Sequence, residues 1–316
     1  MEFTRWFRKR EKVNEGAPQV LLWPDTFNNY FHPPVAKAAV EVLEHAGYQV
    51  TIPERSLCCG RPLYDFGMLK TAKRLLKEAL DEMSDPIQSG VPMIGLEPSC
   101  LAVFRDEMIN LFPNDWNARR LYPKCFTLSQ FLEKENKPGV PRLSRKALVH
   151  GHCHHKAILT MKAEERLYDR MGLDYEVLDS GCCGMAGSFG LEKEHYSISV
   201  ACGERALLPA VRQAEQSTLI IADGFSCREQ ISQMTHRKAK HTAEILQMAI
   251  NAGSEPRPAN PAQRRLGWAA VAAGAVAGVA ASLNRIRQAN PILDRRPALD
   301  YARLAAQASG VNSAIF

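Results

Sequence analysis

The sequence Leu57-Cys58-Cys59-Gly60 has a counterpart in Gly181-Cys182-Cys183-Gly184, and this repetition is the strongest indication of the fold. Cys182 lies 124 positions after Cys58, and Cys227 lies 127 positions after Cys100. Counting 127 positions back from Cys153 leads to Thr26, so one landmark of the second copy has no cysteine in the first. These spacings predict a duplicated unit of about 125 residues.

Both copies show the same alternation of short apolar runs and helical periodicity. Strands are predicted at residues 20–23, 48–52, 91–96, 147–149, 175–178 and 218–222. Helices are predicted after Pro33-Pro34, over 68–80 and after residue 155, and a long helical region is predicted over 196–212. Strands that alternate with amphipathic helices indicate a mostly parallel sheet.

The predicted fold class is therefore α/β, with two pseudo-duplicated, mostly parallel-sheet units. Their cysteine-bearing loops lie at the carboxyl ends of strands, where open α/β sheets bind ligands. We predict four segments: a basic N-terminal arm over 1–17, flexible or used for contact; a first unit over 18–140; a second unit over 141–250; and a linker with an Ala-rich helical tail over 251–316.

The composition is that of a globular protein with an unusual number of thiols. The chain has 316 residues, 46% hydrophobic and 23% charged, with a net charge of +6 that is too small to indicate a nucleic-acid partner. Residues 1–16 are basic without a following apolar run, so we expect no signal sequence. Nine cysteines, two pairs of them adjacent, then predict a reducing, cytoplasmic location and metal or redox chemistry rather than disulfides.

The second unit carries four cysteines on three separate predicted loops: Cys153, Cys182, Cys183 and Cys227. Four thiolates suit an iron–sulfur cluster or a zinc ion. Adjacent cysteines do not easily occupy two corners of one tetrahedron, which favours a polynuclear cluster over a simple zinc ribbon. The remaining cysteines Cys125 and Cys202 are predicted to pack as small apolar side chains.

The first unit has only Cys58, Cys59 and Cys100 for an equivalent site. Asp25-Thr26 stand where the second unit has His152-Cys153. Three outcomes stay open from the residues: a cluster with a non-cysteine ligand, a different metal, or no metal.

Several other residues near the predicted cysteine loops are candidates for tuning a cluster. His152, His154 and His155 bracket Cys153 and would tune or ligate the cluster, move protons, or serve only packing and capping. Gly184 would let the backbone approach a bulky cofactor. Asp223 and Arg228 flank Cys227, and we expect a helix cap and a surface charge, or else groups that set the local field.

Five segments together resemble the cysteine-rich CCG-domain family. They are Leu57-Cys58-Cys59-Gly60 through Gly67, Gly95 through Cys100, Gly151-His152-Cys153-His154-His155, Ser180 through Gly190, and Ala222 through Gln230. The family includes the B chain of heterodisulfide reductase, the iron–sulfur subunits of glycolate oxidase and anaerobic glycerol-3-phosphate dehydrogenase, lactate-utilisation proteins, and the carboxyl-terminal part of FAD-linked D-2-hydroxyacid oxidases such as those acting on D-lactate or D-2-hydroxyglutarate. The resemblance covers about residues 18–250.

The resemblance implies an iron–sulfur module that passes electrons between a flavin unit and an acceptor. The family motif has five cysteines per unit and ends in C-x2-C, whereas Glu97 and Gly224 occupy the first position of that pair here. The resemblance therefore implies one [4Fe–4S] cluster in the second unit. FAD and a ferredoxin-like segment are expected on a partner, because no cysteine run or Gly-rich dinucleotide fingerprint for either occurs in the sequence.

The leading prediction is an electron-transfer subunit of a flavin-dependent 2-hydroxyacid oxidoreductase, with substrate oxidation on the partner's flavin. Two alternatives are an enzyme that acts on a sulfur substrate at the cluster, as in heterodisulfide reductase, and a zinc-stabilised binding module. Residues 266–283 form an uncharged, Ala-rich stretch, for which spanning, docking on a membrane surface or partner, and packing as a helix stay open. Docking there would make the protein peripheral to the inner face of the membrane.

Overall fold

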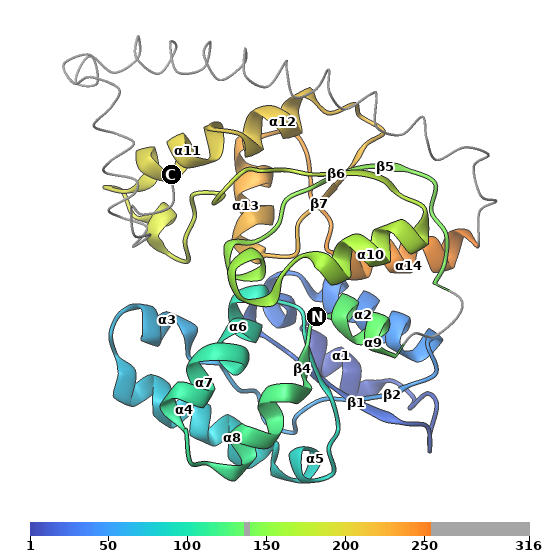
Figure 1. The fold of residues 1–316 in the computed structure, drawn as a ribbon, viewed down its shortest axis with the longest axis vertical. Coiled ribbons are helices and arrows are strands. Elements are labelled where there is room, and N and C mark those ends of the chain that lie inside the picture. The colour runs from blue at the N-terminus through green and yellow to red at the C-terminus, as the bar shows by residue number, and fades with distance from the viewer. Residues whose placement is uncertain (136–139, 254–316) are drawn as a thin grey trace.

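The computed structural model describes residues 1–135 and 140–253 as two α/β units (Figure 1). The elements up to residue 135 are α1 (Phe3–Lys9), β1 (Gln19–Trp23), η1 (Phe27–Phe31), α2 (Pro33–His45), β2 (Gln49–Thr51), α3 (Arg61–Asp65), α4 (Leu69–Glu82), α5 (Ser84–Gln88), β3 (Met93–Gly95), α6 (Pro98–Ala102), η2 (Val103–Glu107), α7 (Met108–Leu111), α8 (Trp116–Leu121), η3 (Tyr122–Lys124), β4 (Cys125–Phe126) and α9 (Leu128–Lys134). The elements from residue 140 are β5 (Lys146–Val149), η4 (His155–Leu159), α10 (Lys162–Met171), β6 (Asp174–Val177), η5 (Phe189–Leu191), α11 (Tyr196–Glu204), α12 (Leu207–Gln213), β7 (Leu219–Ile221), α13 (Phe225–Met234) and α14 (Thr242–Ala252).

The two sheets have the same topology, which confirms the predicted fold class. The first sheet has the order β2-β1-β3-β4 and the second has the order β6-β5-β7. Every strand pair in the described part of the chain is parallel. A parallel bridge from Ile221 to Lys240 puts Lys240 where β4 stands in the first sheet. The duplication therefore extends to the fourth sheet position.

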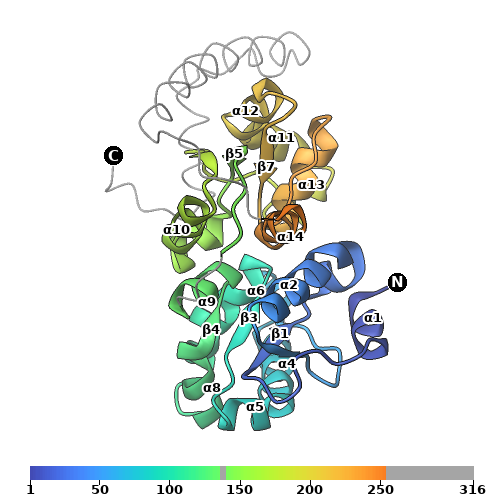
Figure 2. The same cartoon turned by 90° about the vertical axis from the view of Figure 1, so that its right-hand side faces the viewer.

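The two units pack on each other reciprocally (Figure 2). Helix α14 of the second unit lies along α2 of the first, and α9 of the first unit packs on α10 of the second. Both α9 and α14 begin with a capping box, in which Thr127 and His241 cap the helix. One apolar core runs through the junction and includes Leu43, Leu132, Leu167 and Ala249. These packing contacts hold the two units, and with them their cysteine-bearing segments, in one relative position.

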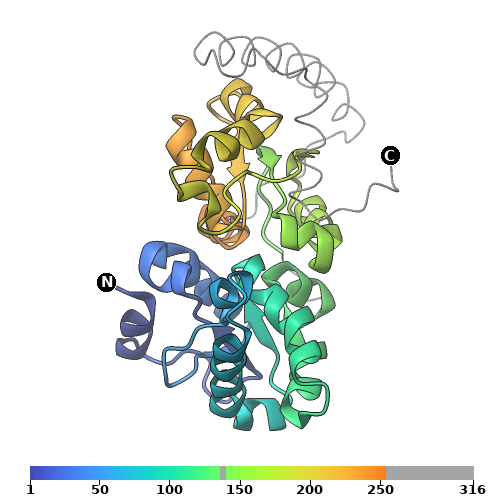
Figure 3. The ribbon, with the colours of Figure 1, turned by 90° about the vertical axis from the view of Figure 1, so that its left-hand side faces the viewer.

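The basic N-terminal segment forms an ordered helix where a flexible arm was one expectation. Helix α1 buries Phe3 beneath Trp6 and Phe7 on the flank of the first unit (Figure 3). Arg10 forms an ion pair with Glu44, and Arg8 donates to the carbonyl of Glu54 at 2.6 Å. The apolar side chains of the segment explain this docking, and two of its basic residues, Arg8 and Arg10, contact the same chain.

Two details of the secondary structure were not predicted. The predicted helical region 196–212 is helical and consists of two helices, because Ala206 leaves helical geometry before Pro209, which is tolerated only in the first turn of α12. Strand β4 was missed because it has two residues.

Within residues 1–135 and 140–253 no helix is long and apolar enough to cross a membrane. The stretch 266–283 and the rest of the predicted tail lie outside the described residues.

Candidate functional site

The four cysteines of the second unit come together at the carboxyl edge of its sheet. Cys153 follows β5, the adjacent pair Cys182 and Cys183 follows β6, and Cys227 lies in the first turn of α13 after β7. Their thiols form one chain of neighbours, because Cys153 hydrogen-bonds with Cys182, Cys182 with Cys183, and Cys183 with Cys227. Cys153 is exposed at one end of this chain, and Cys227 is buried at the other. We call this set the second-unit thiol site.

The glycine after the adjacent cysteines is required by the backbone. Gly184 has φ +100°, and a Cβ at this position would lie 2.1 Å from the carbonyl oxygen of Ser199. Its amide N–H donates to Cys182 Sγ at 3.3 Å. Because only glycine fits, the chain can turn sharply here and aim a backbone N–H at a sulfur atom.

The pKa values alternate along the second-unit thiol site. The pKa of Cys182 is lowered, chiefly by hydrogen bonds from Cys153 and Cys183, and the pKa of Cys227 is lowered, chiefly by a hydrogen bond from Cys183. The pKa values of Cys153 and Cys183 are raised, because these thiols donate to the other two. The site thus favours thiolates, the ligand form of cysteine, at two of its four positions.

Two predicted histidines lie beside Cys153. The Nδ1 atoms of His152 and His154 are each 3.9 Å from Cys153 Sγ, and the two rings are stacked with centroids 5.4 Å apart. A Cβ on Gly224 would lie 2.2 Å from Cδ2 of His152. The imidazole of His152 therefore fills the space that a side chain at position 224, where the family motif has a cysteine, would need.

His150 belongs to the same site and is absent from the predicted residues. It is buried, and its Nδ1 lies 2.6 Å from Oγ of Ser180. It also hydrogen-bonds with Cys227, and a ring nitrogen of His150 and the sulfur atoms of Cys183 and Cys227 all lie within 4.8 Å of one another. The usable signal was its position directly after β5, at the carboxyl edge of the sheet.

The first unit repeats the site with one thiol fewer. Thr26 hydrogen-bonds with Cys58, Cys58 with Cys59, and Cys59 Sγ donates to Cys100 Sγ at 3.1 Å. Thr26 thus occupies the place of Cys153, as the spacing of the sequence indicated. We call Thr26, Cys58, Cys59 and Cys100 the first-unit site.

Carboxylates surround the first-unit site. The pKa values of all three thiols are raised, and a hydrogen bond from Cys58 to Cys59 is the largest cause for Cys58. A hydrogen bond from Cys59 lowers the pKa of Cys100, but burial together with Asp25 and Glu97 outweighs it and raises that pKa to about 11. Burial and the charge of Glu97 raise the pKa of Asp25 to about 6. These thiols therefore stay protonated, which disfavours metal binding by this site as it stands.

Glu97 takes part in capping instead of ligation. One carboxylate oxygen accepts from the backbone N–H of Ser99 at 3.3 Å, and the other accepts from the N–H of Phe225 at 2.8 Å. These donors begin α6 and α13, the helices that carry Cys100 and Cys227. Glu97 thus caps α6 and α13 together and connects the two helices that carry Cys100 and Cys227.

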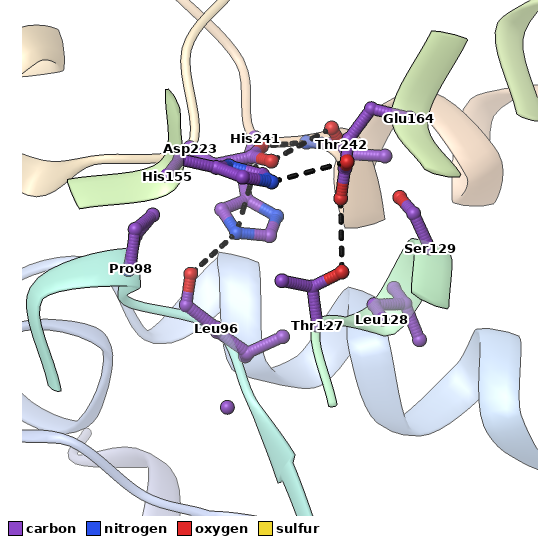
Figure 4. Close-up of a pocket in the computed structure, with 11 residues that line it drawn as sticks. Leu96, Pro98, Thr127, Leu128, Ser129, His155, Glu164, Asp223, His241 and Thr242 are labelled. Carbon is purple, nitrogen blue, oxygen red and sulfur yellow. Dashed lines mark hydrogen bonds and ion pairs between the residues drawn. The ribbon is translucent and has the colours of Figure 1, made fainter. Parts of the chain in front are cut away.

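His155 and Asp223 lie in a separate polar pocket between the units (Figure 4). Nε2 of His155 is 3.0 Å from a Glu164 oxygen, and Asp223 accepts from the backbone N–H of Thr242 at 2.7 Å, which caps α14. Burial lowers the pKa of His155, but Glu164 and Asp223 raise it by more. No cysteine lines this pocket.

Arg228 is not the predicted surface charge. It is 3% exposed, donates to the carbonyls of Ala222 and Asp223, and reaches Oδ1 of Asn28 in the first unit at 3.3 Å. It therefore ties the second-unit loop before Cys227 to the first unit.

The comparisons with known proteins agree with this duplicated architecture. The sequence profile of the cysteine-rich domain (CCG) family matches residues 25–105 and 147–232. The C chain of anaerobic glycerol-3-phosphate dehydrogenase from Escherichia coli K12 is 30% identical over 255 residues, which cover 78% of this chain and 63% of that protein. Lactate utilization protein A of Bacillus subtilis is 30% identical, over 72% of this chain and 98% of the relative. D-2-hydroxyglutarate dehydrogenase of Pseudomonas putida is 27% identical, over 72% of this chain but 22% of the relative.

The chain thus spans about 63% of the length of the glycerol-3-phosphate dehydrogenase chain and nearly all of the lactate-utilisation protein. The first matched range contains the first-unit site, and the second contains the second-unit thiol site. The chain belongs to the cysteine-rich CCG-domain family and carries the domain twice.

Proposed function

We propose that the chain is an iron–sulfur electron-transfer module of a flavin-dependent oxidoreductase. The observation that carries the proposal is the second-unit thiol site, in which four soft donors from the segments after β5, β6 and β7 meet at the carboxyl edge of a parallel sheet. When bound there, a cluster would supply one-electron transfer. Cys153, Cys182, Cys183 and Cys227 would hold it.

The donor set fits an iron–sulfur cluster better than a single zinc ion. Cys182 and Cys183 are adjacent, so their sulfur atoms suit different metals of one cluster more easily than two corners of one tetrahedron. The amide N–H of Gly184 already points at Cys182 Sγ, as amides do around iron–sulfur clusters. Four thiolates match the usual ligand count of [4Fe–4S], which is the cluster type that we propose.

The chain's own residues would shield and adjust such a cluster. Cys183 and Cys227 are buried in an apolar group with Leu148, Met185 and Ile231, which limits access of water to that end of the site. His152 and His154 cover the exposed end beside Cys153. Burial and hydrogen bonds to sulfur are the means by which a protein sets a cluster's potential.

A partner is expected to supply FAD and a ferredoxin-like segment. One relative is called a subunit of a dehydrogenase, which supports a shared catalytic assembly. Another is called D-2-hydroxyglutarate dehydrogenase, which supports a 2-hydroxyacid as the substrate of that assembly. Exposed apolar side chains follow the adjacent cysteines of both units and would suit such a contact: Phe66, Met68 and Leu69 in the first, and Leu191, Tyr196 and Ile198 in the second. We expect the assembly in the reducing cytoplasm, at the inner face of the membrane if residues 266–283 dock there.

Anaerobic purification followed by iron and acid-labile sulfide analysis and EPR tests this proposal. We expect about four iron and four sulfide per chain and an EPR signal that appears on reduction. About one zinc per chain without iron would contradict it and select a zinc module, for which the grouping of His150 with Cys183 and Cys227 is the supporting observation.

A second assay separates electron transfer from chemistry on a sulfur substrate. We expect reduced protein alone to leave a disulfide substrate intact, while a flavoprotein dehydrogenase partner reduces the cluster. Thiol release from the disulfide by this chain alone would instead support the heterodisulfide-reductase type of activity, for which the exposure of Cys153 is the favourable observation.

A further inference from the structure

A buried arginine of the first unit reaches the second-unit thiol site. Arg61 directly follows Gly60 and begins α3, yet its guanidinium lies against His154, which is 93 positions away. The arginine is 8% exposed and forms an ion pair with Glu107, which is 7% exposed. Burying such a pair is seldom a net source of stability. Its placement thus calls for an explanation other than stability.

The contact determines which nitrogen of His154 carries hydrogen. Nη2 of Arg61 lies 2.5 Å from Nε2 of His154. A guanidinium has only donors and stays protonated, so Nε2 must accept. The opposite tautomer would place an N–H against an N–H. In neutral His154 the hydrogen therefore resides on Nδ1.

Nδ1 of His154 is the atom that faces the cysteine ligand. It lies 3.9 Å from Cys153 Sγ, within reach of a hydrogen bond to sulfur. His152 presents its own Nδ1 at the same distance, but that atom already accepts the backbone N–H of His154 at 3.2 Å. Of these two histidines, His154 is thus the one set up to donate to Cys153.

We infer that Arg61 is a positioning residue that crosses from the first unit to the second and fixes His154 so that its Nδ1–H donates to Cys153. The inference rests on the proposed function in one respect, since the hydrogen bond matters most when Cys153 ligates a cluster. An N–H donor to a ligating sulfur stabilises the more negative, reduced cluster and so raises its reduction potential.

The first unit thereby has a role that needs no metal, which is to position Arg61 toward the second-unit thiol site. Gly60 has φ +80°, and a Cβ there would lie 3.3 Å from the carbonyl oxygen of Ala72, so the turn is built around glycine. This turn sets the direction in which Arg61 leaves the chain. The Cys-Cys-Gly turn of the first unit then serves as the support for a residue that acts on the second-unit site.

The first test is a redox titration of the holoprotein followed by EPR. We expect Arg61→Met to shift the equilibrium constant for reduction about tenfold toward the oxidised cluster, which is about 59 mV for one electron. Arg61→Lys keeps a charged donor and should restore most of the potential. Arg74→Met is the matched control, because Arg74 is an exposed arginine of the same unit that pairs with Glu78 on its own helix. A potential that is equal in Arg61→Met, Arg74→Met and wild type would overturn the inference.

The second test reads the tautomer itself and needs no cluster. In full-length, metal-free protein with ¹⁵N-labelled histidine, we expect the His154 resonances, assigned through His154→Gln, to show a protonated Nδ1 and an unprotonated Nε2. Arg61→Met should release this preference. A protonated Nε2 in the wild type would refute the inference, even if the cluster assembles. If no cluster assembles, the proposed function fails, and the tautomer still decides whether Arg61 fixes His154.

Discussion

Thr26 in the first unit and Cys153 in the second lie at the same point of two equivalent sheets, next to Cys58 and Cys182 respectively. Around the hydroxyl of Thr26, all three neighbouring thiols have raised pKa values and two carboxylates lie close by. Around Cys153, the pKa values alternate, and imidazoles take the place of the carboxylates.

The fold thus determines where the thiols of each unit come together, while a few neighbouring side chains determine what the thiols can bind. Carboxylates near a thiol keep it protonated, whereas neutral or cationic groups favour the thiolate that metals require. Glu97 and Gly224 occupy equivalent positions in the two units and also differ in role. Glu97 places a carboxylate beside the first-unit site and caps two helices, whereas Gly224 leaves space for the imidazole of His152. We therefore propose that the second unit binds the cluster and that the first unit supports it.

Exchanging Thr26 and Cys153, the residues at equivalent positions of the two units, should have the largest effect of the variants proposed here, and the effect should be on metal content. We expect Cys153→Thr to lower iron per chain at least about tenfold, since even indirect partners of a metal ligand contribute 10- to 100-fold to affinity. Thr26→Cys should add metal to the first-unit site and raise total iron above the wild-type value. Metal analysis by mass spectrometry measures both, with Cys202→Ser as the control outside either site. Equal iron in Cys153→Thr and wild type would break the comparison.

Asp25 should make the metal-free protein less stable as pH rises. Its pKa is about 6 in the folded chain, against an ordinary value of 3.8, so the native state binds more protons between these values. Stability is then fully present below about pH 4 and is lost toward pH 6, by an amount on the order of 3 kcal/mol. Urea unfolding at several pH values measures this slope. Asp25→Asn should flatten it, and the exposed Asp179→Asn should not; a slope that survives Asp25→Asn would assign it elsewhere.

A side chain at position 224 should displace His152. Gly224 has an ordinary φ of −72°, so any effect of Gly224→Ala is steric and comes from the 2.2 Å approach to Cδ2 of His152. Overpacking of this kind costs about 2 kcal/mol, measured as a loss in unfolding free energy. The double variant Gly224→Ala/His152→Ala should recover part of this loss. Full tolerance of the single variant would show that His152 does not need this space.

Glu97→Gln should have the smallest effect of the series. It keeps one acceptor oxygen and loses the other, so one of the helix N-termini that Glu97 caps loses its partner. We expect a cost of about 1 kcal/mol in thermal or urea unfolding, and iron content equal to the wild type. Glu78→Gln serves as the control, because Glu78 is a partly exposed residue of α4 that caps no helix. A large loss of iron would instead make position 97 a ligand position.

Much of the fold could be predicted from local pattern, because strand lengths, helix periodicity and the Cys-Cys-Gly repeats all indicate the same duplication. The site was accessible for the same reason, since residues just past parallel strands share one edge. The contributions of Arg61 and Arg228 were not accessible, because they depend on how one unit packs on the other. His150 escaped prediction because a histidine one residue past a strand has no distinctive spacing, and α1 because its basic residues obscured its three aromatic ones.

The most direct test of the unequal roles is iron content in two matched double variants, purified anaerobically beside the wild type. We predict that Cys182→Ser/Cys183→Ser lacks iron, labile sulfide and the EPR signal. Cys58→Ser/Cys59→Ser should retain about four iron per chain, as in a single [4Fe–4S] cluster. Loss of iron in the first-unit variant with retention in the second-unit variant would contradict the assignment of the cluster to Cys153, Cys182, Cys183 and Cys227.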